Sequence, residues 1–302
     1  MLGPAPKESP LRFVCSLAFT PPDQLLALAQ AADAAGFEAV AVSDHVVHPR
    51  EIATPYPYTA DGAPRWQPFT PWPDPFVAIG AMAAVTSRLR FLTSILVLPL
   101  RSPLLVAKAA ATAAALSGGR VTLGVGAGWM REEFVLLEQP FEGRGRRMDE
   151  MIDVLRALWA GGWVEHHGEF YDFAPLEMSP APAEAVPIWV GGVSGPALRR
   201  AARRGDGWIS DLHTTEELRG IVARLRRARA DSERAGRPFA VCAAVKDAFD
   251  LDGYRRAADA GVTHLQTMPW VFYPGASESL EGKCDGIRRF GDEIVAKLAE
   301  VP

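Results

Sequence analysis

The sequence predicts a single parallel (β/α)8 barrel, and three observations lead to that prediction. The chain has 302 residues, enough for one large α/β domain or two small ones. Short apolar runs alternate with segments of helical periodicity along most of the chain. The apolar runs lack the polar alternation of a sheet with one wet face, so we expect both faces of each strand to be buried.

Eight strands are predicted, beginning near residues 11, 37, 89, 121, 187, 208, 239 and 262. Eight strand–helix units in a chain of this length match the (β/α)8 barrel. An open, doubly wound sheet is the alternative, because a count of strands does not prove closure. No linker divides the chain, so we expect one domain over residues 1–302, with residues 1–10 as a loose, proline-rich tail.

The helices are predicted from apolar residues at helical spacing. Leu25, Leu28 and Ala32 share one face, and Gly36 follows where a C-terminal cap belongs. The other predicted helices are Phe76–Ser87, Pro103–Leu116, Arg146–Trp159, Gly195–Arg204, Glu216–Ala235, Asp252–Ala260 and one within Glu278–Leu298.

Two segments exceed a minimal barrel. Val46–Pro75 follows the second strand and is rich in proline and aromatic residues, among them Tyr56, Tyr58, Trp66, Phe69 and Trp72. Loops of this length are usually functional or disordered, and the aromatic content argues against disorder. Trp163–Phe173 is predicted to form a small hairpin before the fifth strand.

Composition narrows the class of protein. The net charge of −4 offers no basic field for a nucleic-acid backbone, so a nucleic-acid partner is not expected. The three scattered cysteines form no C-x-x-C motif, which suits a reducing cytoplasm. No signal-peptide pattern opens the chain, and the apolar run Leu104–Leu116 is too short to cross a bilayer, so a cytoplasmic protein without membrane contact is expected.

In a barrel of this type, the loops after the strands build the active site. Ser43-Asp44-His45 directly follows the second strand and offers a carboxylate beside an imidazole, a pair suited to acid–base work. The alternative is that Asp44 caps a helix and His45 packs nearby.

Three further clusters follow strand ends. Thr93-Ser94 could hydrogen-bond a flat heterocycle, or could be ordinary buried hydroxyls. Gly124–Glu133 carries three alternate glycines that let a backbone approach a ligand, but it lacks the G-x-G-x-x-G spacing of a dinucleotide fingerprint. Gly191–Gly195 precedes a helix, so its N–H groups could bind a phosphate, or the segment could be a flexible connection.

Other polar clusters have simpler interpretations. His166-His167 lies in the predicted hairpin without further ligand residues, so no metal site is expected. Arg144, Arg146 and Arg147 open a helix and are predicted to form a solvated face, with a phosphate contact as the alternative.

Taken in order, the motifs from about Leu11 to Ile209 resemble the luciferase-like flavin and deazaflavin oxidoreductases, in particular the F420-dependent branch. The motifs are Ser43-Asp44-His45, Leu92–Pro99, Leu116–Val121, Gly124–Trp129, Arg144–Glu150, Pro187–Gly192 and Gly205–Ile209.

The resemblance implies a (β/α)8 barrel with coenzyme F420, a deazaflavin, across its mouth. It implies a non-proline cis peptide at Ser94–Ile95 behind the ring, with Asp44 and His45 beside the ring. It also implies cofactor contacts, including those to the side chain and phosphate, from Gly126, Ala127, Gly128 and Trp129 and from Gly191, Gly192 and Val193.

One departure bears on the substrate. The family's glucose-6-phosphate dehydrogenases carry a Glu as proton donor where this chain has Trp129, and the residues that hold the sugar phosphate are absent here. A sugar phosphate is therefore not expected. Trp66, Trp72, Trp129 and Trp270 are predicted to line a pocket for a less polar substrate.

The first hypothesis is hydride transfer between F420 and a small, fairly apolar alcohol or ketone, enone or imine. His45 would donate or accept the accompanying proton, or hydrogen-bond the substrate oxygen, and Asp44 would orient the histidine or the ring. The alternatives are an FMN-dependent monooxygenase and a deazaflavin-binding protein without catalysis. A homodimer is expected from the resemblance.

Overall fold

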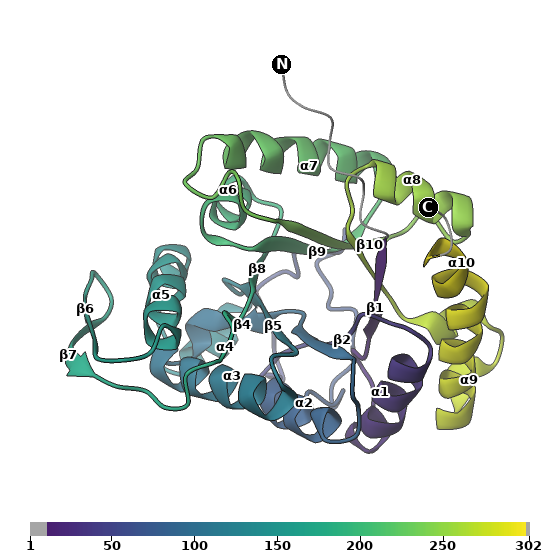
Figure 1. Ribbon diagram of the computed structural model, residues 1–302, viewed down its shortest axis with the longest axis horizontal. Helices are drawn as coiled ribbons and strands as arrows, with labels where there is room; N and C mark the ends of the chain where they lie inside the picture. Colours follow the sequence, from purple (N-terminus) through teal and green to yellow (C-terminus); the bar gives the residue numbers. More distant parts are fainter. Residues whose placement is uncertain (1–10, 300–302) are drawn as a thin grey trace.

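The eight predicted strands form, and they close into a parallel barrel surrounded by helices (Figure 1). The computed structural model describes residues 11–299, so the predicted tail at residues 1–10 lies outside the described residues. The barrel strands are β1 (Arg12–Ser16), β2 (Ala39–Val42), β3 (Arg90–Thr93), β5 (Val121–Gly126), β8 (Ile188–Gly191), β9 (Gly207–His213), β10 (Ala240–Val245) and β11 (His264–Thr267), with β4 (Leu96–Val97) extending β3.

Pairing between β3 and β5 closes the ring, which rules out the open-sheet alternative. The sheet runs β3-β2-β1-β11-β10-β9-β8-β5, every neighbouring pair is parallel, and Phe91 of β3 pairs with Val121 of β5. The prediction of a (β/α)8 barrel is confirmed.

Burial of both faces of each strand explains why the strands are apolar throughout. Along β1, Phe13 and Cys15 face the layer between barrel and helices, whereas Val14 faces the barrel interior. Trp189 and Ile209 join Val14 in that interior cluster.

Eight helices pack around the ring. They are α1 (Leu25–Ala34), α2 (Pro75–Ala83), α3 (Pro103–Ser117), α5 (Arg144–Trp159), α6 (Gly195–Arg204), α7 (Thr215–Ala230), α8 (Leu251–Asp259) and α9 (Leu280–Phe290). Local signals fix their ends. Asp74 caps α2 by accepting from the Phe76 and Val77 amides, and Thr214 and Glu217 form a capping box on α7.

Three elements differ from the sequence prediction. The predicted third strand is split at Ser94-Ile95, because five residues from Leu92 to Leu96 lie opposite four from Thr122 to Val125 on β5. The last helix is interrupted by a π-helical turn before α10 (Ala296–Ala299). Helix α4 (Arg131–Leu136) was not predicted, because its six residues are too few for a helical period to show.

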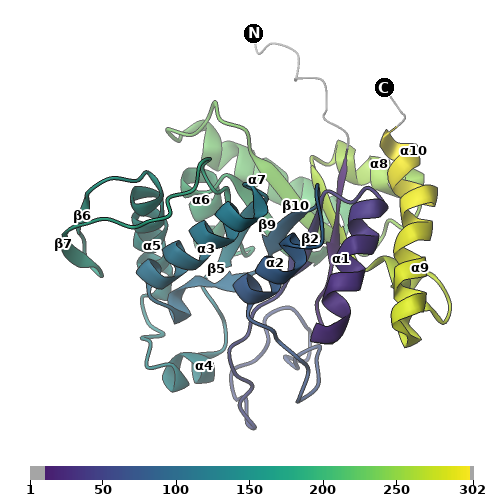
Figure 2. The same ribbon diagram turned by 60° about the horizontal axis from the view of Figure 1, so that its bottom comes forward.

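The two extra segments lie at separate places on the barrel. The loop between β2 and α2 projects from the same end as α4, whereas the hairpin of β6 (Val164–His167) and β7 (Asp172–Leu176) stands at the side (Figure 2). This end carries the carboxyl termini of the strands. None of the helices within residues 11–299 is long and apolar enough to span a membrane.

A buried histidine lies at the opposite end of the barrel. His264, at the start of β11, is 8% exposed, and its ring centroid lies 4.8 Å from that of Trp189. Burial, with the charges of Arg12 and Arg90, lowers the pKa of His264 to about 4. The ring is therefore neutral at pH 7.

Candidate active site at the barrel mouth

Asp44 is fixed by an arginine. Its carboxylate accepts from Arg101 Nη1 at 2.8 Å, from Arg101 Nη2 at 2.7 Å and from the Val97 amide at 3.0 Å. The side chain is buried, so this bidentate pair is protected from solvent. Asp44 thereby joins the β2 end to the segment after the Ser94-Ile95 bulge, and a direct role at a cofactor ring stays a prediction.

His45 is held by a glutamate from α4. Its Nδ1 lies 3.1 Å from Oε2 of Glu133, which is 1% exposed. The prediction that Asp44 orients the histidine is therefore corrected: the carboxylate in contact with the imidazole belongs to Glu133. Because a carboxylate only accepts hydrogen bonds, Nδ1 carries a hydrogen and Nε2 remains available for a ligand.

Glu132 and Glu133 together hold the long loop after β2, and we call them the α4 clasp. The Glu133 Oε1 accepts from the Val46 amide at 2.6 Å. The Glu132 Oε1 accepts from the amides of Ala53 at 2.8 Å and Thr54 at 3.0 Å. Burial opposes ionisation of Glu132, but hydrogen bonds from its own amide and from Thr54 outweigh burial and hold its pKa below the ordinary value.

An aromatic cluster surrounds His45. The imidazole centroid lies 5.0 Å from the rings of Trp66 and Trp72 and 6.3 Å from Trp129. Tyr56 packs edge-on against Trp66 at 5.3 Å and Trp129 at 5.1 Å. The structure thus brings three of the four predicted tryptophans to the histidine.

Trp270 does not join this cluster. Trp270 is buried against α9. The backbone of Trp270 lies so close to position 286 that only a glycine fits there. The ammonium group of Lys283, also in α9, lies 6.0 Å from the centre of the Trp270 ring. The prediction of Trp270 as a pocket residue is corrected, because the turn after β11 directs this side chain into the layer between barrel and helices.

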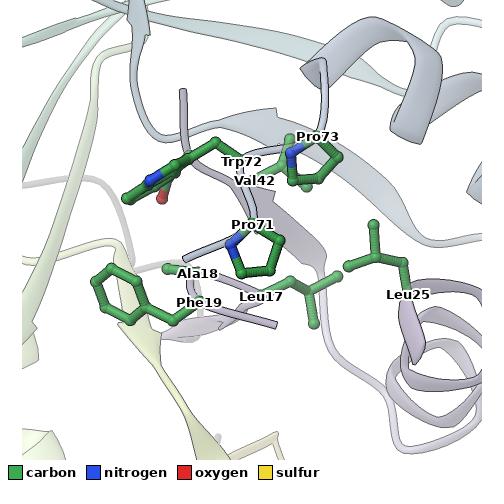
Figure 3. A pocket seen from close by; sticks show the side chains of 9 residues that line it. Leu17, Ala18, Phe19, Leu25, Val42, Pro71, Trp72 and Pro73 are labelled. Carbon is green, nitrogen blue, oxygen red and sulfur yellow. The ribbon is translucent and has the colours of Figure 1, made fainter. Parts of the chain in front are cut away.

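The end of the aromatic loop is seated on the end of β1. Figure 3 shows Pro71, Trp72 and Pro73 around a small cavity with Leu17 and Phe19. The cavity has a volume of about 10 Å³, room for one water molecule at most. Trp72 is therefore closely supported from behind.

The loop is also fixed to β9. Arg65 forms an ion pair with Asp211, and its Nη2 donates to the Tyr58 carbonyl at 2.8 Å. Burial, and then the charge of Asp211, raises the pKa of Tyr56 to about 12, so its phenol stays protonated. These contacts close the loop over one side of the barrel mouth.

The bulge after β3 precedes Val97, whose amide Asp44 accepts from. The Ser94–Ile95 peptide is cis, as the resemblance implies. The Ser94 hydroxyl donates to Oε1 of Gln266 on β11 at 2.9 Å. Side-chain atoms of Ile95 occupy the space that a Cβ at Gly126 would need, so a glycine is required there.

The two glycine loops follow neighbouring strands, because β5 pairs with β8, and α5 contacts the first loop and helix α6. Arg144 of α5 donates to the Gly128 carbonyl at 3.0 Å, and the Gly145 carbonyl accepts from Arg200 of α6 at 2.7 Å. Ser194 caps α6 through the Ala197 amide, so the helix begins directly after the second loop.

Arg147 differs from its prediction as part of a solvated face. It is 5% exposed, its Nη2 donates to the Pro99 carbonyl at 2.9 Å, and its Nε has no hydrogen-bond partner within residues 11–299. Burial lowers its pKa below the ordinary arginine value. A buried guanidinium with an unpartnered N–H is suited to an anionic group.

The histidine pair of the hairpin serves a structural purpose. His166 bonds Oε1 of Glu150 at 3.1 Å, and His167 bonds Asp172 at 2.5 Å. Within residues 11–299, no three potential ligand side chains are grouped to hold a metal ion.

The barrel is parallel, and its mouth carries a buried histidine–carboxylate pair, a bulge after β3 and two glycine loops. This combination is typical of a ligand-binding enzyme. The chain belongs to the luciferase-like monooxygenase family, whose model matches residues 6–274. The family and the oxidoreductase class expected from the motifs are confirmed.

Relatives cover most of the chain. An uncharacterised protein of Mycobacterium tuberculosis is 40% identical over 291 residues, which cover 95% of this chain and 100% of that protein. The F420-dependent glucose-6-phosphate dehydrogenase of Beutenbergia cavernae is 36% identical over 245 residues, 79% of this chain and 68% of that enzyme.

Solved structures share the fold. An F420-dependent secondary alcohol dehydrogenase in complex with an F420-acetone adduct superimposes with a TM-score of 0.75 at 18% identity, covering 97% of this chain and 100% of that one. A type II Baeyer–Villiger monooxygenase of Pseudomonas putida in complex with FMN gives 0.61 at 18% identity, covering 94% and 83%.

Proposed function

We propose that the protein is an F420-dependent oxidoreductase in which His45 exchanges a proton with a small organic substrate. The observation that carries this proposal is the buried contact between His45 and Glu133 beside the bulge at the barrel mouth. The 36% identical relative named as an F420-dependent enzyme supports the choice of cofactor.

The described residues fit a phosphorylated deazaflavin. Ile95, behind Gly126, offers an apolar floor for a flat ring. Arg147 offers a buried guanidinium whose Nε has no partner within the described residues, which suits a phosphate. Gly191, Gly192 and Val193 precede the N-terminus of α6 and offer backbone N–H groups to an anion.

The bound deazaflavin would supply a hydride to carbon or accept one from it. Reduction of a carbonyl also needs one proton at oxygen, and His45 would donate it from Nε2. Glu133 would stabilise the protonated imidazole through Nδ1 and hold the ring in one orientation. In the oxidation direction, Nε2 would accept the proton of the alcohol.

The substrate is proposed to be small and fairly apolar: an alcohol or ketone, an enone or an imine. The cluster of Trp66, Trp72 and Trp129 around His45 supports this choice, because its surface is mostly hydrocarbon and its rings are held in place.

The test begins with cofactor binding. The purified protein is titrated with F420 and, separately, with FMN, and binding is followed by absorbance and fluorescence. We expect tighter binding of F420 and a marked weakening of it in Arg147→Met. Tighter FMN binding together with oxygen-dependent turnover would instead indicate a monooxygenase.

Turnover is then measured on a panel of ketones, enones and imines with reduced F420. His45→Ala should lower kcat by about 10²-fold or more and leave the F420 dissociation constant nearly unchanged. His167→Ala, in the exposed hairpin, is the matched control. Wild-type turnover by His45→Ala would refute the assigned role, and F420 binding without turnover on any substrate would favour a carrier protein.

A homodimer in the cytoplasm completes the proposal. Helices α2 and α3 pack together and expose apolar side chains, with Val77 at 74% and Leu105 at 70% exposure. The three cysteines are free thiols, which suits a reducing compartment. Light scattering at several concentrations tests the dimer, and Leu105→Glu should shift it toward monomer.

A further inference from the structure

We propose that the cleft beside His45 selects an amphipathic carboxylate and that Arg50 binds the carboxylate group. The inference rests on the proposed function, because it names the substrate class for the same histidine. The cleft lies between two segments of the long loop, residues 45–50 and 68–72, and has a volume of about 730 Å³. That volume lies in the range of sites for small organic ligands.

One part of the cleft is reactive. His45 lines it, and so does Trp72, whose ring centroid lies 5.0 Å from the imidazole. The cleft therefore brings solvent-borne molecules to the residue that is proposed to exchange the proton.

A second part is cationic. Arg50 lines the cleft and forms no ion pair within residues 11–299, and the lining contains no carboxylate. His48 also lines it and accepts from Trp66 Nε1 through Nδ1 at 3.4 Å, so its Nε2 carries a hydrogen that can be donated. Glu133, the carboxylate in contact with His45, is already bonded to that histidine and to the Val46 amide.

A third part is apolar and uncovered. Val46, Val47, Pro68 and Phe69 line the cleft. Phe69 is 99% exposed and has a φ of 68°, so the loop presents its ring to water. A hydrocarbon group in the cleft would remove this ring from water, which is favourable because apolar surface is buried.

The chemistry of the three parts defines one class of ligand. A single guanidinium with parallel N–H groups matches a planar carboxylate. The apolar lining matches an alkyl or aryl chain, and the reactive carbon would lie toward His45. An oxo or unsaturated carboxylic acid with such a chain satisfies all three parts.

The test uses two probes of equal shape, 4-phenylbutanoate and its neutral amide, 4-phenylbutanamide. Binding to the full-length protein without added cofactor is measured by tryptophan fluorescence and by calorimetry. We expect the acid to bind about fivefold to tenfold tighter than the amide, with a preference that falls as salt is added.

Variants separate the two contacts. Arg50→Gln should abolish the preference for the acid and leave amide binding unchanged. Phe69→Ala should weaken acid and amide by the same factor. Arg224→Gln is the matched control, because this exposed arginine of α7 makes the same change in net charge far from the loop.

Equal binding of acid and amide to the wild-type protein, or an acid preference that survives Arg50→Gln, would overturn the inference. F420 binding is measured in the same preparation. If F420 binds and the acid preference is absent, the inference about Arg50 fails and the proposed F420-dependent function stands. If the acid preference is present and F420 does not bind, the carboxylate site stands and the proposed F420-dependent function fails.

Discussion

Replacing Glu133 with glutamine is the sharpest test of how the histidine works. Glutamine keeps the shape of the side chain and can still accept from the Val46 amide, but it loses the charge. It also places an N–H donor where Nδ1 of His45 needs an acceptor, so the imidazole hydrogen moves to Nε2 or the contact breaks.

The size of the effect follows from two hydrogen bonds. Each bond to a charged acceptor contributes about 1.5–3 kcal/mol and each neutral one about 1 kcal/mol, so the variant loses about 2 kcal/mol in total. For a chain of 302 residues, that loss lowers Tm by about 3 °C. If His45 exchanges the proton as proposed, loss of the carboxylate that orients it should lower kcat by about 10²-fold.

Glu132→Gln supplies the matched control. Glu132 is the other half of the α4 clasp and holds the amides of Ala53 and Thr54, but it makes no hydrogen bond to His45. It should lower Tm comparably and change kcat little. Tm is measured by scanning calorimetry and kcat at saturating substrate and cofactor. Equal losses of kcat in the two variants, or wild-type kcat in Glu133→Gln, would refute the reasoning.

Two further predictions concern the barrel itself. A Cβ at Gly124 would overlap the Thr93 carbonyl oxygen, so Gly124→Ala should lower Tm by more than 10 °C or prevent folding. Gly220→Ala, on the open face of α7, should instead raise stability by about 1 kcal/mol. Thermal unfolding of both variants checks this, and equal Tm values would contradict it. Because burial lowers the pKa of His264 to about 4 from 6.5, the unfolded chain binds one more proton between these values and stability falls as pH drops through that window. His264→Phe should remove about 2 kcal/mol of this loss between pH 7 and pH 4.5, measured by urea unfolding at the two pH values, and an unchanged pH dependence would contradict the assignment.

The fold could be predicted from the sequence because its signal is local. Each strand is a short apolar run, and Gly36 and Gly118 mark helix ends by a positive φ that glycine tolerates. Closure of the barrel required the β3–β5 pairing, which no local pattern encodes.

The site was predictable only in part. The position of His45 after a strand pointed to function, but its partner Glu133 is 88 residues away in the chain. The sequence carried one sign of this contact: Glu133 ends the glycine-rich cluster that follows another strand, so both residues were expected at the same end of the barrel. Pairing of Asp44 with Arg101 was missed for the same reason, and burial of Arg147 was missed because an arginine-rich helix start usually faces solvent.

The α4 clasp has a consequence for exchanging pockets between relatives. The shape of the aromatic loop depends on amides that Glu132 and Glu133 hold from a helix about eighty residues later in the chain. A chimera that receives the loop alone would leave those amides without acceptors. Transfer of specificity therefore requires the loop and α4 to move as one two-part module, and natural variation in the pocket should occur in the two segments together.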